Sequence, residues 1–248
     1  MADLFSKLTP IVNKCMSNHD PSHNPAHVHR VVALARTILS AETSSTATTT
    51  TNKPRRSYDP TVVDLAALLH DIADRKYLYE IASTIATLSN PSSSSNALAF
   101  PDEISPTNLV QQMLVAHGAD AALAHRVQTI VSHVSYTVER SDASKVRQLI
   151  DGEFPELAIV QDADRLDAIG AIGIGRCFTF LGARGRDFVP EGSQWDMQNA
   201  VEHFEEKLEK LEGMMKTDTG RAMARERTAR LLEFRRWWEE EMHVGELV

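Results

Sequence analysis

Apolar side chains recur at helical spacing along almost the whole chain, and this periodicity restricts its fold more than any other feature. In the segment 3–17, for example, Leu4, Leu8, Ile11 and Cys15 form one stripe. Alternating runs of β-branched residues between hairpin turns, which are typical of strands, are absent from the sequence. The pattern therefore predicts an all-α fold.

Further helices are predicted at 25–41, 60–73, 107–117, 120–134, 143–150, 156–182, 193–216 and 219–241. Asn24 is the expected N-cap of the second helix, with Pro25 at its first position. Two Ser- and Thr-rich stretches, 43–56 and 89–106, have too few apolar residues to pack and are predicted to be flexible surface insertions. The length suits a single domain over 1–248.

Composition narrows the classes of function and the compartment. The 248 residues are 42% hydrophobic and 24% charged, and a net charge of −8 makes nucleic-acid binding unfavourable. Cys15 and Cys177 show no metal-site or disulfide spacing, which favours a reducing compartment. The start of the chain lacks a signal-peptide pattern, and no apolar run reaches the roughly 18 residues of a membrane span. We expect a cytoplasmic protein without a membrane partner, with a nuclear location left open.

Histidines and carboxylates in three segments could hold a metal ion together. His70 and Asp71 follow an apolar run, where an imidazole and a carboxylate are costly to bury without a partner. His27 lies in the first turn of an earlier helix. The later DADRLD segment offers three carboxylates, of which Asp164 and Asp167 share a helix face. The ordered set is a stronger indication of metal binding than the His-Asp pair alone.

These segments resemble a known family. The sequences SHNPAHVHRV from Ser22, LHDIAD from Leu69 and VQDADRLDAIGAIGIGR from Val160 resemble the HD-domain superfamily of metal-dependent phosphohydrolases. HFEEKLEKLEGMMKTDTG from His203 is similar to the same branch, which usually has Asp where this chain has Asn24. The resemblance covers most of the chain outside the two insertions. It implies an HD-type helical domain with additional C-terminal helices.

The resemblance implies that His27, His70, Asp71 and Asp164 are the metal ligands. This donor set suits one divalent ion, with manganese favoured and magnesium, iron, cobalt, nickel and zinc left open. Such an ion would activate a water and screen charge on a phosphoryl group. Helix rotation turns Asp162 away from Asp164 by about 200°, so Asp162 is expected to cap or support rather than to ligate.

Other polar residues are assigned to substrate and proton transfer. Asp74, one turn after the His-Asp pair, is expected to be the general acid or base. Arg30, Lys76 and Arg165 are the expected phosphate partners, although Lys76 and Arg165 could equally be solvated surface charges. His133 is a candidate for a phosphate or second-metal contact, and a satisfied core histidine is the alternative.

Two further patterns favour packing over chemistry. GAIGIGR, from Gly170, follows no predicted strand and lacks the GK[ST] ending of a phosphate loop, so its glycines are expected to pack helices closely. Trp237 and Trp238 cannot both face one core, so one of them could mark an interface. A homodimer is left open on this ground.

The predicted function is metal-dependent hydrolysis of a phosphate ester or anhydride in a small phosphorylated substrate, with a nucleotide preferred. The related branch implies nucleoside triphosphate pyrophosphohydrolysis as the first activity to test. Two alternatives stay open: an HD-type hydratase or hydrolase of a small non-phosphorylated molecule, and a nucleotide sensor without turnover. Inward-pointing cations at Arg30, Lys76 or Arg165 would favour a phosphate site over the hydratase.

Overall fold

A computed structural model describes residues 3–17, 19–44, 56–72, 105, 107–187, 192–193 and 195–243. The helices are α1 (Leu4–Met16), α2 (Pro25–Ser44), α3 (Pro60–Leu69), α5 (Leu109–Ala116), α6 (Ala121–Val131), α7 (Tyr136–Ser141), α8 (Ala143–Asp151), α9 (Glu156–Asp167), α10 (Gly170–Arg184), α11 (Gln198–Glu206) and α12 (Asp218–His243). Two 3-10 helices, η1 (Gly185–Asp187) and η2 (Leu208–Met214), complete the set. Within these residues there is no strand, and the all-α prediction is confirmed.

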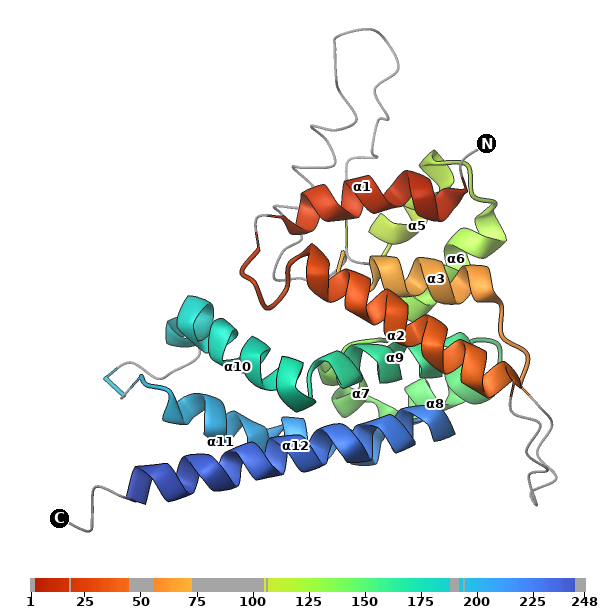
Figure 1. Ribbon diagram of the computed structural model, residues 1–248. Coiled ribbons are helices and arrows are strands. Elements are labelled where there is room, and N and C mark those ends of the chain that lie inside the picture. The colour runs from red at the N-terminus through yellow and green to blue at the C-terminus, as the bar shows by residue number, and fades with distance from the viewer. Residues whose placement is uncertain are drawn as a thin grey trace, which may run out of the picture.

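Helix α9 is the centre of the molecule. All of its residues except Asp164 are buried. It packs against α2, α3, α6, α8, α10 and α12, and Figure 1 shows it between α1 on one side and the long α12 on the other. A helix that is buried all round must satisfy its polar side chains inside the protein. The polar groups of α9 therefore decide how the other helices are placed.

Local sequence fixes where the two helices beside α9 begin. The Asn24 side chain accepts a hydrogen bond from the Ala26 N–H, which confirms the predicted cap of α2. The Asp59 carboxylate accepts from the Thr61 N–H at the start of α3. The apolar faces of α2 and α3 then pack against each other and against α9.

The prediction of one helix over 156–182 was wrong. The chain bends by 70° between α9 and α10. Gly170 has a φ of 71°, in the left-handed region that favours glycine. A Cβ on Gly173 would lie 2.2 Å from the carbonyl oxygen of Ala168. The glycines thus permit a tight corner. The expected close packing between helices is confirmed at Gly170, where a Cβ would lie 3.1 Å from Arg227 Cβ of α12, but not at Gly175, where a Cβ would meet open space.

The predicted helix over 193–216 is not a single helix in the structure. The single helix expected at 193–216 is divided into α11 and η2 at Lys207, whose φ and ψ are −136° and −55°. Phe204 and Leu211 are nevertheless buried as predicted. Trp237 is half exposed, whereas the Trp238 ring packs against Phe178. Outside the C-terminal third, the short helix α7 was not predicted from the sequence.

The two predicted insertions lie largely outside the described residues. Thr43 is an exception, because α2 extends to Ser44 and the Thr43 hydroxyl donates to the Leu39 carbonyl. Among the described helices, none alone is long and apolar enough to cross a membrane. The bent pair α9 and α10 meets that test by length and composition when the two are taken together.

Asp162 ties α9 to the start of α12. Its fully buried carboxylate accepts hydrogen bonds from the Lys216 N–H at 2.9 Å and from the Thr217 N–H at 2.8 Å. It also accepts from the Thr217 hydroxyl at 2.7 Å, and that hydroxyl accepts from the Gly220 N–H. A Cβ on Gly220 would lie 2.3 Å from the carboxylate. The expected capping role of Asp162 is confirmed.

Replacing Asp162 with alanine should destabilise the protein strongly. The change leaves two backbone N–H groups and a hydroxyl buried without their acceptor, and each such group costs about 1–3 kcal/mol. We expect the free energy of unfolding, measured by urea titration, to fall by about 3 kcal/mol or more. Asp218→Ala is the control, because this carboxylate pairs with Arg221 at the surface and should contribute about 1 kcal/mol or less. Equal losses in the two variants would contradict the assigned role of Asp162.

Candidate metal centre

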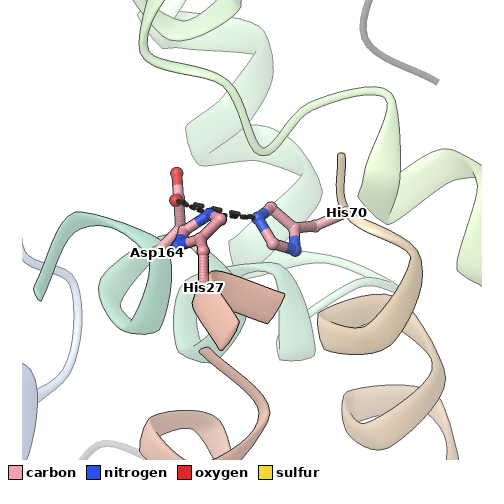
Figure 2. A group of neighbouring side chains, drawn as sticks. All are labelled: His27, His70 and Asp164. Atoms are coloured by element: carbon pink, nitrogen blue, oxygen red, sulfur yellow. Dashed lines mark hydrogen bonds and ion pairs between the residues drawn. The ribbon is translucent and has the colours of Figure 1, made fainter. Parts of the chain in front are cut away.

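Three helices bring the predicted ligands together at the centre of the molecule. His27 lies in the first turn of α2, His70 is the C-cap of α3, and Asp164 is the partly exposed residue of α9. Figure 2 shows the two imidazole rings and the Asp164 carboxylate pointing toward one another. The ligand atoms of these three residues all lie within 4.8 Å of one another.

Asp71 completes this cluster, and we call His27, His70, Asp71 and Asp164 the metal group. The two Nε2 atoms are 3.1 Å apart, and Asp71 Oδ2 lies 3.2 Å from each of them. Asp164 Oδ1 lies 3.7 Å from the Nε2 of His27 and 3.8 Å from that of His70. Atoms that bind one ion at about 2.0–2.2 Å are separated by about 3–4 Å. The spacing of the metal group therefore fits a shared cation.

The hydrogen bonds of the rings orient their lone pairs into the cluster. Nδ1 of His27 donates to Asp167 Oδ2 at 2.7 Å, and Nδ1 of His70 donates to the Ala67 carbonyl at 2.9 Å. A neutral imidazole has one N–H, so each Nε2 then presents a lone pair. Asp71 Oδ2 is buried and makes no directed hydrogen bond within the described residues. Electron-pair donors that face one another in a buried site require a positive charge between them.

The pKa values of the cluster express the same requirement. Burial lowers the pKa of His70, but the Asp71 and Asp164 carboxylates outweigh burial and raise it to about 9. Burial raises the pKa of Asp71, yet the His70 and His27 rings hold it well below its ordinary value. A proton on His70 can thus supply the positive charge that a divalent cation would otherwise supply.

Asp167 supports the metal group through its hydrogen bond to the His27 ring. It was not assigned as a site residue from the sequence. Besides His27, its carboxylate binds Arg30 through two hydrogen bonds of 2.7 and 3.0 Å, and Arg176 through one of 3.1 Å. Burial raises the pKa of Asp167, but its hydrogen bonds to His27 and Arg30 and the charge of Arg176 lower it below the ordinary range. The carboxylate is therefore ionised and holds the His27 ring with Nδ1 protonated.

The spacing of Asp164 and Asp167 in the sequence agrees with this supporting role. Asp164 and Asp167 are one turn apart and share a face, so one can ligate while the other supports a ligand. Nothing in the sequence alone pairs Asp167 with Arg176. That contact exists because the corner at Gly170 turns α10 back toward the end of α9.

Of the two predicted arginines, Arg30 lies beside the metal group and Arg165 lies away from it. Arg30 is one-third exposed beside the metal group, where its bond to Asp167 fixes it. Arg165 is buried, forms an ion pair with Glu139 and donates to the Met214 carbonyl at 3.0 Å. The structure therefore does not bring Arg165 to the metal group, and we do not retain it as a phosphate contact.

His133 has structural partners within the described residues. Its Nδ1 donates to the Thr129 carbonyl at 2.7 Å, and its own carbonyl accepts from the Gln161 amide at 2.8 Å. These contacts match the alternative of a satisfied histidine. Asp74 and Lys76 lie outside the described residues, so their assigned roles stay predictions.

Relatives of known structure share this architecture. No family model matches the chain. A structure from Lactobacillus plantarum is 24% identical with a TM-score of 0.65, and the match covers 98% of this chain and 100% of that one. An HD-superfamily hydrolase from Bacillus thuringiensis is 23% identical with a TM-score of 0.58, and the match covers 96% of each chain. These two likenesses show that the chain shares its fold with both structures.

Bacillus subtilis YpgQ is a more similar relative. The crystal structure of YpgQ in complex with ADP is 30% identical, with a TM-score of 0.60 and coverage of 96% of this chain and 94% of that one. In sequence, the uncharacterized protein YpgQ of strain 168 is 33% identical over 232 residues, which are 93% of this chain and 90% of that protein. The chain therefore belongs to the family of Bacillus subtilis YpgQ.

Proposed function

We propose that the chain is a metal-dependent phosphohydrolase that cleaves a phosphoanhydride bond of a nucleotide. The observation that carries the proposal is the convergence of two Nε2 lone pairs and two carboxylates in the metal group, with both Nδ1 atoms already donating elsewhere. The structure of the relative YpgQ in complex with ADP supports a nucleotide as the ligand. The HD-superfamily name of a fold neighbour agrees with hydrolysis.

His27, His70, Asp71 and Asp164 would hold one divalent ion. Their mixed nitrogen and oxygen donors suit manganese, iron, cobalt or nickel better than magnesium, and manganese is the ion we propose. When bound, such an ion supplies a Lewis acid that polarises a phosphoryl oxygen and acidifies water. Asp167 keeps the His27 ring in one tautomer and also holds Arg30, which is a proposed phosphate contact. Asp74 is the proposed proton-transfer residue, and Lys76 is a proposed phosphate contact.

The proposed reaction adds water to a nucleoside triphosphate. An oxygen–phosphorus bond forms between water and the α-phosphorus, and the bridging bond to the β-phosphate breaks. The products are a nucleoside monophosphate, pyrophosphate and a proton. The chain's own residues contribute by binding the anion, orienting the reacting groups and moving the proton.

A substrate panel tests this proposal directly. Metal-stripped protein, supplied in turn with manganese, magnesium, zinc, cobalt or nickel, is incubated with nucleoside mono-, di- and triphosphates, and phosphate and pyrophosphate are detected separately. We expect pyrophosphate from triphosphates, and more of it with manganese than with magnesium. Binding of nucleotides without any product would instead support a sensor. Absence of both binding and product would leave the hydratase alternative.

His70→Ala and Asp71→Ala should each abolish retention of manganese while the helical content is kept. The two side chains end a helix whose packing is made by other residues, so the fold does not depend on them. His117→Ala is a matched control, because His117 is also a helix C-cap whose Nδ1 donates to a carbonyl of its own helix. Metal analysis with circular dichroism checks this, and normal manganese content in both ligand variants would refute the ligand assignment.

Asp167→Asn should weaken manganese binding by about 10–100-fold, as is typical when the partner of a metal-binding imidazole is removed. The neutral amide no longer holds the His27 N–H as firmly and loses its charge pairing with two arginines. Asp64→Asn is the control, since Asp64 forms a similar two-bond pair with Arg36 on an exposed face. Metal titration of folded protein decides the point. An unchanged affinity in Asp167→Asn would remove its supporting role.

A further inference from the structure

The Arg176 guanidinium joins two segments that meet beside the metal group. Its Nε donates to the Ser22 carbonyl, in the loop before α2, at 2.7 Å, and its Nη1 donates to Asp167 Oδ2, at the end of α9, at 3.1 Å. The Arg176 side chain is only 13% exposed. A planar guanidinium that donates to two acceptors holds both of them in one geometry. Arg176 of α10 therefore ties the loop before α2 to Asp167.

The loop that supplies the Ser22 carbonyl is itself held in place. Ser22 is buried, and both its N–H and its hydroxyl donate to Asp20 Oδ1, the N–H at 2.9 Å. The Ser22 hydroxyl oxygen also lies 2.6 Å from Nδ1 of His23. The His23 ring in turn lies edge-on to the His27 ring, with 6.0 Å between their centroids. Arg176 is thus anchored on an ordered segment that already contacts a residue of the metal group.

The other donors to the Asp167 carboxylate come from a single helix. His27 Nδ1 donates to Oδ2 at 2.7 Å, and Arg30 donates to Oδ1 at 2.7 Å and to Oδ2 at 3.0 Å. His27 and Arg30 both lie on α2, one turn apart. Among the residues that the structure describes, Arg176 is the one donor to this carboxylate from another helix. Without it, the carboxylate would be held only by α2, partly through Arg30, whose side chain is one-third exposed.

The position of Asp167 is important because the His27 ring lies between two carboxylates. Asp167 Oδ2 is 2.7 Å from Nδ1 of this ring, and Asp71 Oδ2 is 3.2 Å from its Nε2. A neutral imidazole has one N–H, and the carboxylate that binds this N–H more firmly decides which nitrogen carries the proton. In the tautomer with the proton on Nε2, the ring would donate to Asp71 and could not bind a metal ion through that atom. Loosening of Asp167 therefore favours the tautomer that does not ligate.

We propose that Arg176 is a positioning residue of the metal group, which fixes Asp167 against Nδ1 of His27 and so keeps the Nε2 lone pair available to a metal ion. The proposal rests on the function proposed above, because it takes His27 as a ligand of that site. It extends the site to a residue of α10 that acts through Asp167. Manganese alone is a sufficient probe, so the test needs no substrate.

Arg176→Met should weaken manganese binding about tenfold, as is typical when the support of a metal-binding imidazole is lost. Methionine is unbranched and has no N–H donor in its side chain. Arg227→Met is the matched control, because Arg227 is likewise half-buried at this corner but donates to the Leu166 carbonyl of α9. In metal titrations of folded protein, the control should bind manganese with nearly the parent affinity. Equal losses in the two variants would overturn the proposal.

A double-mutant cycle separates action through Asp167 from a general effect on the fold. In the background of Asp167→Asn, Arg176→Met should cause little further loss of manganese affinity, because the contact that it supports is already weakened. Additive losses would contradict the proposal. Arg176→Lys keeps the charge and can reach only one of the two acceptors, so it should still bind manganese less tightly than the parent. It decides the question if Arg176→Met fails to fold, and parent affinity in Arg176→Lys would also overturn the proposal.

The tautomer of His27 can be measured without a metal ion. In the metal-free parent, the ring ¹⁵N chemical shifts should show the His27 proton on Nδ1, and Arg176→Met should show a larger share of the Nε2–H form. Arg227→Met should match the parent, and an unchanged tautomer in Arg176→Met would refute the role of Arg176. If the parent binds no manganese, the proposed function fails and this measurement still decides the role of Arg176. If manganese binds as expected but no nucleotide is hydrolysed, the proposed reaction fails and the assignment of Arg176 stands.

Discussion

Buried charge on α9 is the constraint on which the rest of the structure depends. Four ionisable side chains of this helix are almost completely removed from water: Glu156, Asp162, Arg165 and Asp167. A buried charge is tolerated only with a partner and hydrogen bonds. Each of the four side chains has its partners on other elements of the fold. The charges of α9 therefore help to determine which helices surround it and where along α9 they pack.

The partners distribute these contacts over the whole molecule. Glu156 pairs with Arg126 of α6 and accepts from the backbone N–H of Asp59 before α3. Arg165 reaches Glu139 of α7, and Asp167 reaches α2 and α10. The metal group depends on the same arrangement, because two of its residues come from α2 and α9, and the pair of Arg30 with Asp167 joins these two helices. The contacts that place the metal group therefore also hold the core helices together.

Some features of the fold and the site could be predicted from the sequence, and others could not. Periodicity identified the main helices, because burial of an apolar face repeats every three to four residues and needs no knowledge of the partner. The motifs selected His27, His70, Asp71 and Asp164, which the structure places together. The corner after α9 was missed, since apolar spacing continues through it. The corner depends on the close approach of Gly173 to the Ala168 carbonyl, which becomes visible only in the folded chain.

Residues with partners distant in sequence were the least predictable. Arg165 resembles a phosphate contact by its position beside Asp164, yet successive helix residues point in different directions and Arg165 meets Glu139 instead. Asp167 and Arg176 could be recognised only when the bend had placed them face to face. Short helix α7 is likewise held by tertiary contacts, as Glu139 is its buried residue.

The 70° corner between α9 and α10 also separates two sets of contacts along the chain. Asp164 and Asp167 lie before the corner, in or beside the metal group. Phe178 lies after it and packs against the rings of Phe204 on α11 and Phe234 on α12. Across the corner, Arg176 of α10 reaches back and donates a hydrogen bond to the Asp167 carboxylate at the end of α9. Sequence change along α10 beyond Arg176 can therefore alter how this helix packs on α11 and α12 while the metal group stays in place, so the C-terminal helices are free to vary independently of it.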